Sequence, residues 1–322
     1  MKTLTIKNPW ATLIIEGHKQ YEFRSWKTNY RGKILIHTSK KEDKEDIKRF
    51  ESLNLKYINS AIIGEATLTD CILVDKEFDE NLRKENPLVY GNEHYNKTYA
   101  WKLENIKKYD KPIFASGHLG LWNYEEKAYE DLKTPQELYY FMENNIKYGI
   151  HGTDGKDYDA SDDEKFQNAC NTVYALCDKD RILKYGLGHC WDQTELERDF
   201  FKNNNYEHKT LFICFMIEGE NNYPTHAYLV YKKDDKWYLF EHSDYYNRGI
   251  KKFDSYEDAV RHQMNNHIKG AKDMGNEINE DVINSIRIYE YNIEKHGIST
   301  EEFIDNILEN SNDITKKIIK KS

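Results

Sequence analysis

The sequence predicts an α+β protein with two domains, a small β-barrel followed by a mixed domain of helices and strands. At 322 residues the chain is long enough to form two hydrophobic cores. Residues 1–125 contain several short strand patterns without a strand–helix–strand rhythm, which is typical of a small barrel. The later residues combine capped helices with apolar strands. The charge divides in the same way, with a net charge of +3 over residues 1–125 and −12 over the remainder.

The N-terminal domain, residues 1–125, is expected to contain one buried helix and several short strands. Asn8 and Pro9 are a helix N-cap followed by proline at the first helical position, and Gly17 is a natural helix stop. Strand-like alternation occurs at residues 19–24, 32–37, 61–70, 98–103 and 112–116, and a charged surface helix is expected at 41–52.

The C-terminal domain is expected to cover residues 134–310, after a polar linker at 123–133. Thr134 and Glu137 have the spacing of a capping box and Pro135 occupies the first helical position, so a helix begins there. A second capping box at Ser161 and Glu164 predicts a helix to about residue 176, and apolar strands are expected at 211–216, 225–231 and 236–241.

The cysteines and the hydropathy exclude several classes of protein. The chain has five cysteines and no CxxC pair, which argues against a disulfide framework and against a zinc knuckle. No apolar run approaches the length of about 18 residues that a membrane span needs. The first residues lack the layout of a signal peptide. We therefore expect a cytoplasmic protein that has no contact with a membrane and uses no metal or other cofactor.

Several motifs in the first 125 residues resemble the ASCH domain family. They are IKNPWATLIIEGHKQYEFRSW, YRGKILIHTS, IIGEATL, YAWKLEN and PIFASGHLGLW, in this order. The resemblance implies a barrel related to the PUA fold and a link to RNA. Some small ASCH proteins are amidohydrolases that use a lysine, a threonine and a glutamate. Lys19 and Glu65 match two of these residues, whereas Glu22 stands at the position of the threonine.

The residues of this segment also suggest a ligand site without reference to the family. Lys19, Arg24 and Arg31 lie near Trp26 in the sequence. Cationic groups that hold phosphates, beside aromatic rings on which bases stack, are what a site for single-stranded RNA or a nucleotide needs. The alternative interpretation is a solvated rim of basic residues, with Trp26 packed in the mouth of the barrel.

Cys190 has the sequence context of a reactive cysteine. It follows Gly186 and Gly188, which allow a tight bend, and it precedes a helical pattern in WDQTELERDFF. A thiol at a helix N-terminus feels the positive end of the helix dipole, which lowers the pKa of the thiol and favours the nucleophilic thiolate. The alternative is that Cys190 packs in the core, as free cysteines commonly do.

A nucleophilic cysteine needs a base, and the base needs an orienting group. Residues 225–231 and 236–241 have the pattern of two strands of a hairpin. A loop of two residues at 233–234 or of four residues at 232–235 places His226 directly opposite Glu241, on the same face of the sheet. A slip of one residue in the register would separate them.

The C-terminal motifs resemble the transglutaminase-like family. They are GLGHCWDQTELERDFF, PTHAYLVY and KWYLFEHSDYYNRGI, with flanking similarity at IKYGIHGTDGK and GISTEEFIDNI. The resemblance implies a papain-like fold and a Cys-His-Asp triad, acting on amide or peptide bonds. Cys190 matches the cysteine and His226 the histidine, whereas Glu241 stands where aspartate is usual.

The sequence therefore predicts a thiol hydrolase or acyltransferase joined to a domain that binds RNA or a nucleotide. A protein or a small amide would be the substrate of the C-terminal domain, through hydrolysis, deamidation or acyl transfer. Two alternatives remain open at this stage. The protein could be a non-catalytic RNA-binding adaptor, or an ASCH-type nucleoside amidohydrolase with an inactive C-terminal domain.

Overall fold

The computed structural model describes residues 1–95, 97–217, 223–293 and 295–319. The contacts divide the chain into two compact units, an N-terminal unit (Met1–Ala128) and a C-terminal unit (Tyr129–Ser322). Each hydrophobic cluster of the described residues lies within one unit. No helix in the described part of the chain is long and apolar enough to cross a membrane.

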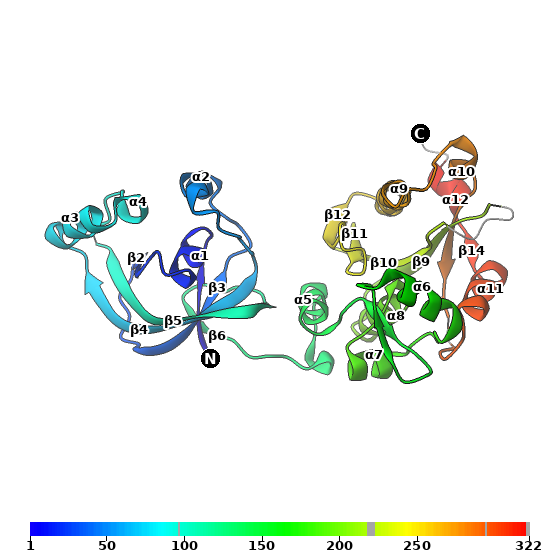
Figure 1. The fold of residues 1–322 in the computed structure, drawn as a ribbon, viewed down its shortest axis with the longest axis horizontal. Helices are drawn as coiled ribbons and strands as arrows, with labels where there is room; N and C mark the ends of the chain where they lie inside the picture. Colours follow the sequence, from blue (N-terminus) through cyan, green and yellow to red (C-terminus); the bar gives the residue numbers. More distant parts are fainter. Residues whose placement is uncertain (96, 218–222, 294, 320–322) are drawn as a thin grey trace. The chain divides into compact units, whose positions relative to one another are not determined.

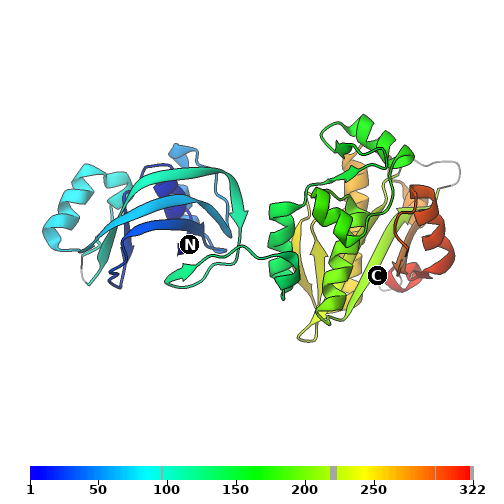
Figure 2. The same cartoon turned by 90° about the horizontal axis from the view of Figure 1, so that it is seen from below.

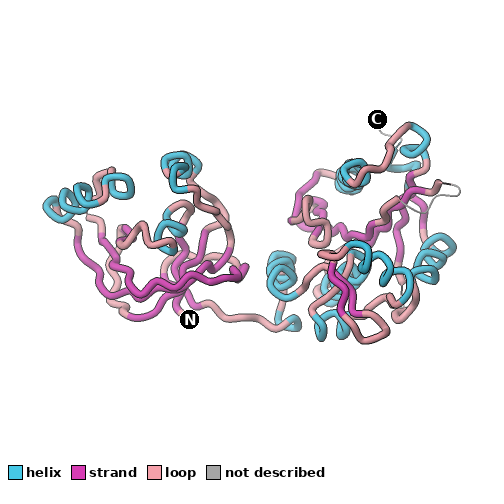
Figure 3. The backbone as a smooth tube through the Cα atoms, viewed as in Figure 1, coloured by secondary structure: helices cyan, strands magenta, loops and turns pink. Residues whose placement is uncertain are grey.

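The N-terminal unit is built on one curled six-stranded sheet (Figure 1). Its strands are β1 (Lys2–Ile6), β2 (Tyr21–Arg24), β3 (Gly32–Thr38), β4 (Ala61–Leu73), β5 (Tyr99–Phe114) and β6 (Leu121–Asn123), in the order β2-β5-β4-β3-β1-β6. β4 and β5 are long and their register shifts at three places. Such bulges increase the local twist and bend a strand, and both strands curve strongly in Figure 3.

Helix α1 (Trp10–Ile15) packs against the core side of this sheet. Ala11, Ile14 and Ile15 lie in one cluster with apolar residues of β1, β3, β4 and β5. The shorter helices are α2 (Lys44–Arg49), η1 (Glu51–Leu53), α3 (Lys76–Glu85) and α4 (Pro87–Tyr90). The patterns at 98–103 and 112–116 predict two strands, but both belong to β5. The charged residues between them extend the strand because they pair with β4.

The C-terminal unit contains a six-stranded antiparallel sheet. Its strands are β9 (His208–Phe215), β10 (His226–Lys233), β11 (Lys236–Glu241), β12 (Gly249–Phe253), β13 (Ile286–Tyr291) and β14 (Asn312–Asp313), in the order β12-β11-β10-β9-β13-β14. A separate hairpin joins β7 (Gly149–His151) to β8 (Asp157–Asp159).

Helices cover both faces of this sheet, α8 (Cys190–Asn203) on one face and α9 (Tyr256–Asp273) on the other (Figures 1 and 2). Successive residues of a strand point to opposite faces of the sheet and therefore pack in different cores. Ala227 and Leu229 of β10 pack in the clusters that contain α8, whereas Tyr228 and Val230 pack with α9. The remaining elements are η2 (Tyr129–Asp131), α5 (Pro135–Asn145), α6 (Asp163–Thr172), α7 (Lys179–Tyr185), α10 (Glu280–Asn284), α11 (Thr300–Asn310) and α12 (Thr315–Ile319).

The helix starts are set by local capping. Thr134 and Glu137 form the reciprocal capping box that their spacing predicts. The expected second box does not form, because Asp162 rather than Ser161 caps α6, and that helix ends at Thr172.

Candidate functional site

The N-terminus of α8 is held in place by a buried carboxylate. Asp192 is fully buried and accepts a hydrogen bond from the backbone N–H of His189, at 3.1 Å. It also accepts bonds from the Tyr174 hydroxyl at 2.8 Å and from the backbone N–H of Cys177 at 2.9 Å. These bonds fix the loop that precedes the helix, so Cys190 begins α8 in a defined position.

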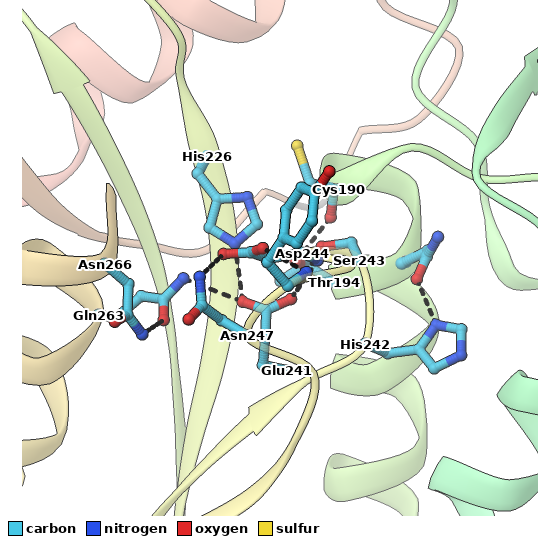
Figure 4. Close-up of polar contacts among 12 residues, drawn as sticks. Cys190, Thr194, His226, Glu241, His242, Ser243, Asp244, Asn247, Gln263 and Asn266 are labelled. Atoms are coloured by element: carbon cyan, nitrogen blue, oxygen red, sulfur yellow. Dashed lines mark hydrogen bonds and ion pairs between the residues drawn. The ribbon is translucent and has the colours of Figure 1, made fainter. Parts of the chain in front are cut away.

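His226 and Glu241 form a buried pair at the ends of two neighbouring strands (Figure 4). His226 is the first residue of β10 and Glu241 the last residue of β11. The Nε2 atom of His226 lies 2.8 Å from Oε2 of Glu241. The expected contact between the imidazole and the carboxylate is therefore present.

The hairpin register behind this contact differs from the expected one. Lys233 pairs with Lys236, which leaves Asp234 and Asp235 as a two-residue loop with φ of 50° and 54°. Two consecutive positive φ values are the geometry of a type I′ turn. The prediction that His226 pairs directly with Glu241 was therefore wrong by two residues. A slip of two keeps both side chains on one face of the sheet, and they meet diagonally.

Both carboxylate oxygens of Glu241 accept hydrogen bonds. Besides His226, Oε2 accepts a bond from the side-chain amide of Gln263 on α9 at 3.1 Å. Oε1 accepts bonds from the Ser243 hydroxyl at 3.1 Å and from the backbone N–H of Asp244 at 2.8 Å. Burial raises the pKa of Glu241, but the charge of His226 and these hydrogen bonds outweigh it, so the net pKa is lowered. The group stays ionised.

Cys190 reaches this pair from the α8 side. The ladder between β10 and β11 begins at Leu229, so the start of β10 has no partner on β11. There the thiol interacts with His226 and with the backbone N–H of Ala227. Burial raises the pKa of the Cys190 thiol, but these interactions and the charges of His189 and His226 lower it overall.

The pKa of His226 shifts in the opposite direction. Burial disfavours its charged form, but the charge of Glu241 and the hydrogen bonds to Cys190 and Glu241 raise the pKa of His226 well above its usual range. A lowered thiol pKa beside a raised imidazole pKa describes a thiolate–imidazolium ion pair. The arrangement can deliver a nucleophile and, from the same imidazole, a proton.

Sequence reasoning missed two residues that act on the thiol. His189 lies directly before Cys190, and its imidazole Nδ1 lies 3.0 Å from Asp192. Burial lowers the pKa of His189, but the charge of Asp192 raises it overall. In the sequence, a histidine directly before Cys190 was the signal that could have indicated this effect on the thiol. The hydroxyl of Tyr148, forty-two positions earlier in the chain, interacts with the Cys190 side chain, and no spacing rule indicates this interaction.

In the N-terminal unit the structure brings Lys19, Glu22 and Arg24 together. Lys19 and Glu22 are both buried and form an ion pair, and Glu22 also lies 3.3 Å from Nε of Arg24. The Lys19 ammonium lies 5.7 Å from the ring centres of Trp10 and Phe23. Burial lowers the pKa of Lys19, although the charge of Glu22 opposes this. The charge of Lys19 is therefore balanced by Glu22 within the N-terminal unit.

Trp26 and Arg31 lie apart from that network. The ring of half-buried Trp26 packs edge-on against buried Trp101 at 4.5 Å between ring centres. Arg31 is exposed and its guanidinium lies 3.1 Å from the carboxylate of Asp70.

Glu65 is not brought to Lys19, contrary to the assignment that the ASCH resemblance implies. Ala66, the next residue on β4, packs in the core cluster, so Glu65 projects from the opposite face of the strand. There it lies 3.3 Å from Lys33 and accepts a hydrogen bond from the Tyr109 hydroxyl at 3.1 Å. The lysine–glutamate part of the amidohydrolase site does not assemble from these two residues.

Comparison with known proteins identifies the N-terminal unit. Residues 4–113 match the ASCH domain family. This segment is an ASCH domain. The match covers the curled sheet from β1 to the end of β5, and the curled half-barrel accords with a PUA-like fold.

The relatives that match are similar over a minor portion of the chain length. Activating signal cointegrator 1 of Homo sapiens is 30% identical over 104 residues, which is 27% of this chain and 18% of that protein. The chain therefore spans less than a fifth of that relative. The solved ASCH protein from Zymomonas mobilis is 16% identical with a TM-score of 0.25, over 35% of this chain and 72% of that one. A solved point mutant of the same protein is 17% identical with a TM-score of 0.23, over 35% of this chain and 74% of that one.

Proposed function

We propose that the C-terminal unit is a transglutaminase-like cysteine enzyme that acts on amide or peptide bonds, and that the ASCH domain binds RNA or a nucleotide. The main support for the enzyme is that Cys190, His226 and Glu241 come from three separate elements and meet with the polarity that a thiol nucleophile requires. The transglutaminase-like motifs around these residues agree with this assignment.

The chemistry follows from the positions of the three groups. The Cys190 thiolate attacks the carbonyl carbon of an amide, and a C–S bond forms while the C=O π electrons move to oxygen. His226 then donates its proton to the leaving nitrogen as the C–N bond breaks. Glu241 holds the imidazole in the required orientation and stabilises its charged form. Water resolves the thioester in hydrolysis or deamidation, and an amine resolves it in acyl transfer.

Alkylation by iodoacetamide tests the activated thiol without a known substrate. Cys190 should react near neutral pH faster than Cys214, whose pKa burial raises to about 12. His226→Ala should slow the reaction of Cys190 because the hydrogen bond and the cation beside the sulfur are lost. Glu241→Gln should slow it less, since the imidazole remains. Peptide mass spectrometry resolves the two cysteines.

Substrate turnover is the second test of the proposed enzyme. It can be measured once a screen for glutamine deamidation or amide cleavage provides a substrate. Cys190→Ala and His226→Ala should each remove nearly all activity, and the double variant should be hardly worse, because members of a catalytic unit are not additive. Equal alkylation of Cys190 and Cys214, or no effect of His226→Ala, would show that the cysteine only packs. The adaptor role would then be the better description.

RNA binding by the ASCH domain is supported by the family match and by cations exposed beside an aromatic residue. Arg31, Lys27 and Lys33 are exposed close to half-buried Trp26 in the sequence, whereas Lys19 is buried. The amidohydrolase alternative has less support because Glu65 faces away from Lys19.

Salt dependence checks this part of the proposal with the full chain. Binding of a short single-stranded RNA should weaken steeply between low and moderate salt, because each phosphate contact releases a counterion. Arg31→Gln should weaken binding and reduce the slope of log K against log salt by about one. Lys84→Gln, an exposed lysine of α3, is the matched control. Absence of binding, or an affinity that ignores salt, would remove RNA as the ligand.

A further inference from the structure

A short backbone ladder places residue 148 beside the N-terminus of α8. The N–H of Lys147 donates to the carbonyl of Gly186 at 2.8 Å, and the N–H of Gly188 donates to the carbonyl of Lys147 at 3.2 Å. The second bond lies two residues before Cys190. The backbone at residue 148 is therefore held beside the segment that leads into Cys190.

The Tyr148 side chain is held against the same core as the thiol. It packs on the cluster that contains Cys190, and its ring centre lies 5.8 Å from that of Phe166. Its hydroxyl interacts with the Cys190 side chain. Burial, followed by the charge of Cys190 and this interaction, raises the pKa of Tyr148 well above its usual range. The phenol is consequently a proton-bearing donor at neutral pH.

We propose that the Tyr148 hydroxyl donates a hydrogen bond to the oxyanion that forms when Cys190 attacks a carbonyl group. This inference rests on the proposed function. When the carbonyl carbon bonds to Sγ, the oxygen on that carbon comes close to the groups that already surround the sulfur. His226 faces the leaving group as the proton donor, so the phenol of Tyr148 is available for the oxygen. A fixed donor of this kind stabilises charge that develops only in the transition state.

An activated ester isolates this step without a natural substrate. With p-nitrophenyl acetate, the Cys190 thiolate bonds to the acetyl carbon and the C=O π electrons move to oxygen. Collapse of that oxyanion expels p-nitrophenolate and leaves S-acetyl Cys190, which water hydrolyses to acetate. The burst of p-nitrophenolate measures acylation. Iodoacetamide alkylates the same sulfur by displacement of iodide, and no oxyanion forms at the carbonyl.

The two reagents give opposite expectations for Tyr148→Phe. Acylation should slow by roughly 100-fold, the usual cost of removing one oxyanion donor. Alkylation should change by less than about threefold once rates are compared at equal thiolate fraction, which the pH dependence of alkylation supplies. Tyr158→Phe is the matched control, because that hydroxyl bonds to Asp154 at 2.7 Å on the neighbouring hairpin. Both of its rates should equal those of the wild type.

The outcomes separate the inference from the function on which it rests. Equal losses in acylation and alkylation would mean that Tyr148 only stabilises the resting thiolate, and unchanged acylation would remove it from the reaction; either result overturns the inference. A wild type that shows no burst, or whose burst survives in Cys190→Ala, overturns the thiol function itself. A cooperative thermal melt checks folding. If the Phe variant fails it, Tyr148→Leu should show the same selective loss.

Discussion

At the scale of the residue, Glu241 is a buried carboxylate that is surrounded by hydrogen-bond donors. Glu241 is almost fully buried, and its two oxygens accept bonds from four groups. Taking an unpaired carboxylate out of water costs several kcal/mol, so these bonds are needed to keep it charged beside His226. The charged carboxylate beside His226 is therefore built into the folded state.

Two other buried histidines remain neutral, and this predicts acid lability. Burial, with the charge of Arg248 or His226, lowers the pKa of His242 and of His267 to about 3. A lowered folded-state pKa contributes stability above the unfolded value of about 6.5, and this stability is lost as pH falls. Between pH 7.5 and 5.0, each histidine should cost about 2 kcal/mol of unfolding free energy. His226 has the opposite shift and adds no slope below about pH 6.5.

Urea denaturation at several pH values measures this loss. His242→Asn keeps a donor near the position of Nδ1, which lies 2.7 Å from the side-chain oxygen of Gln193, but it cannot titrate. The variant should flatten the dependence of unfolding free energy on pH by about one histidine. His262→Asn, at a partly exposed site, is the control and should flatten it less. A variant curve parallel to that of the wild type would show that His242 titrates normally.

At the scale of the element, the position of α8 depends on its first turn. The side chain of Asp192 connects the loop before the helix, the segment at Cys177 and the hydroxyl of Tyr174. The thiol lies at the end of this element. The position of Cys190 therefore depends on the side chain of Asp192 in the first turn of α8.

Asp192→Ala should be strongly destabilising. It removes a buried acceptor and leaves the donors of Tyr174 and Cys177 unpaired, which costs about 3–5 kcal/mol for a buried charged partner. Thermal or urea unfolding measures the loss. Asp163→Ala, at an exposed first-turn position of α6, should cost no more than about 1 kcal/mol. Similar losses for the two variants would contradict the anchoring role of Asp192.

At the scale of the whole molecule, two units with separate cores are joined by a short exposed stretch. Residues 125–128 are exposed, whereas Tyr129 is buried and its hydroxyl donates to the carbonyl of Leu196 at 3.0 Å. The sequence pattern predicts a linker from 123 to 133, but the part after Ala128 packs with the C-terminal unit.

Limited proteolysis should therefore cut the chain first between Glu125 and Ala128. Protease access is greatest at exposed stretches of chain between compact units, and residues 125–128 are exposed. Trypsin should cleave after Lys127 before it cleaves after Lys133, whose backbone N–H donates to Glu137 at 2.9 Å. Mass spectrometry of early fragments should identify two pieces that resist further digestion. Equal early cleavage at both lysines would place the boundary elsewhere.

The amino-acid order by itself determined the local features of this protein. The capping box at Thr134 and the start of a helix at Cys190 follow from residues within one turn of each other, and the structure confirms both. The ASCH motifs identify residues 4–113 for the same reason, since each motif is contiguous. Such signals survive in sequence because neighbours in the chain are obligatory neighbours in space.

Only the tertiary structure decided which distant residues meet. The hairpin register depended on two aspartates adopting positive φ, which the pattern of the strands did not specify. Gln263 reaches Glu241 from α9, Tyr148 reaches Cys190 through a backbone ladder, and Glu65 turns away from Lys19. These contacts arise from the packing of whole elements. Their free energies are shared among many residues, so no short segment encodes them.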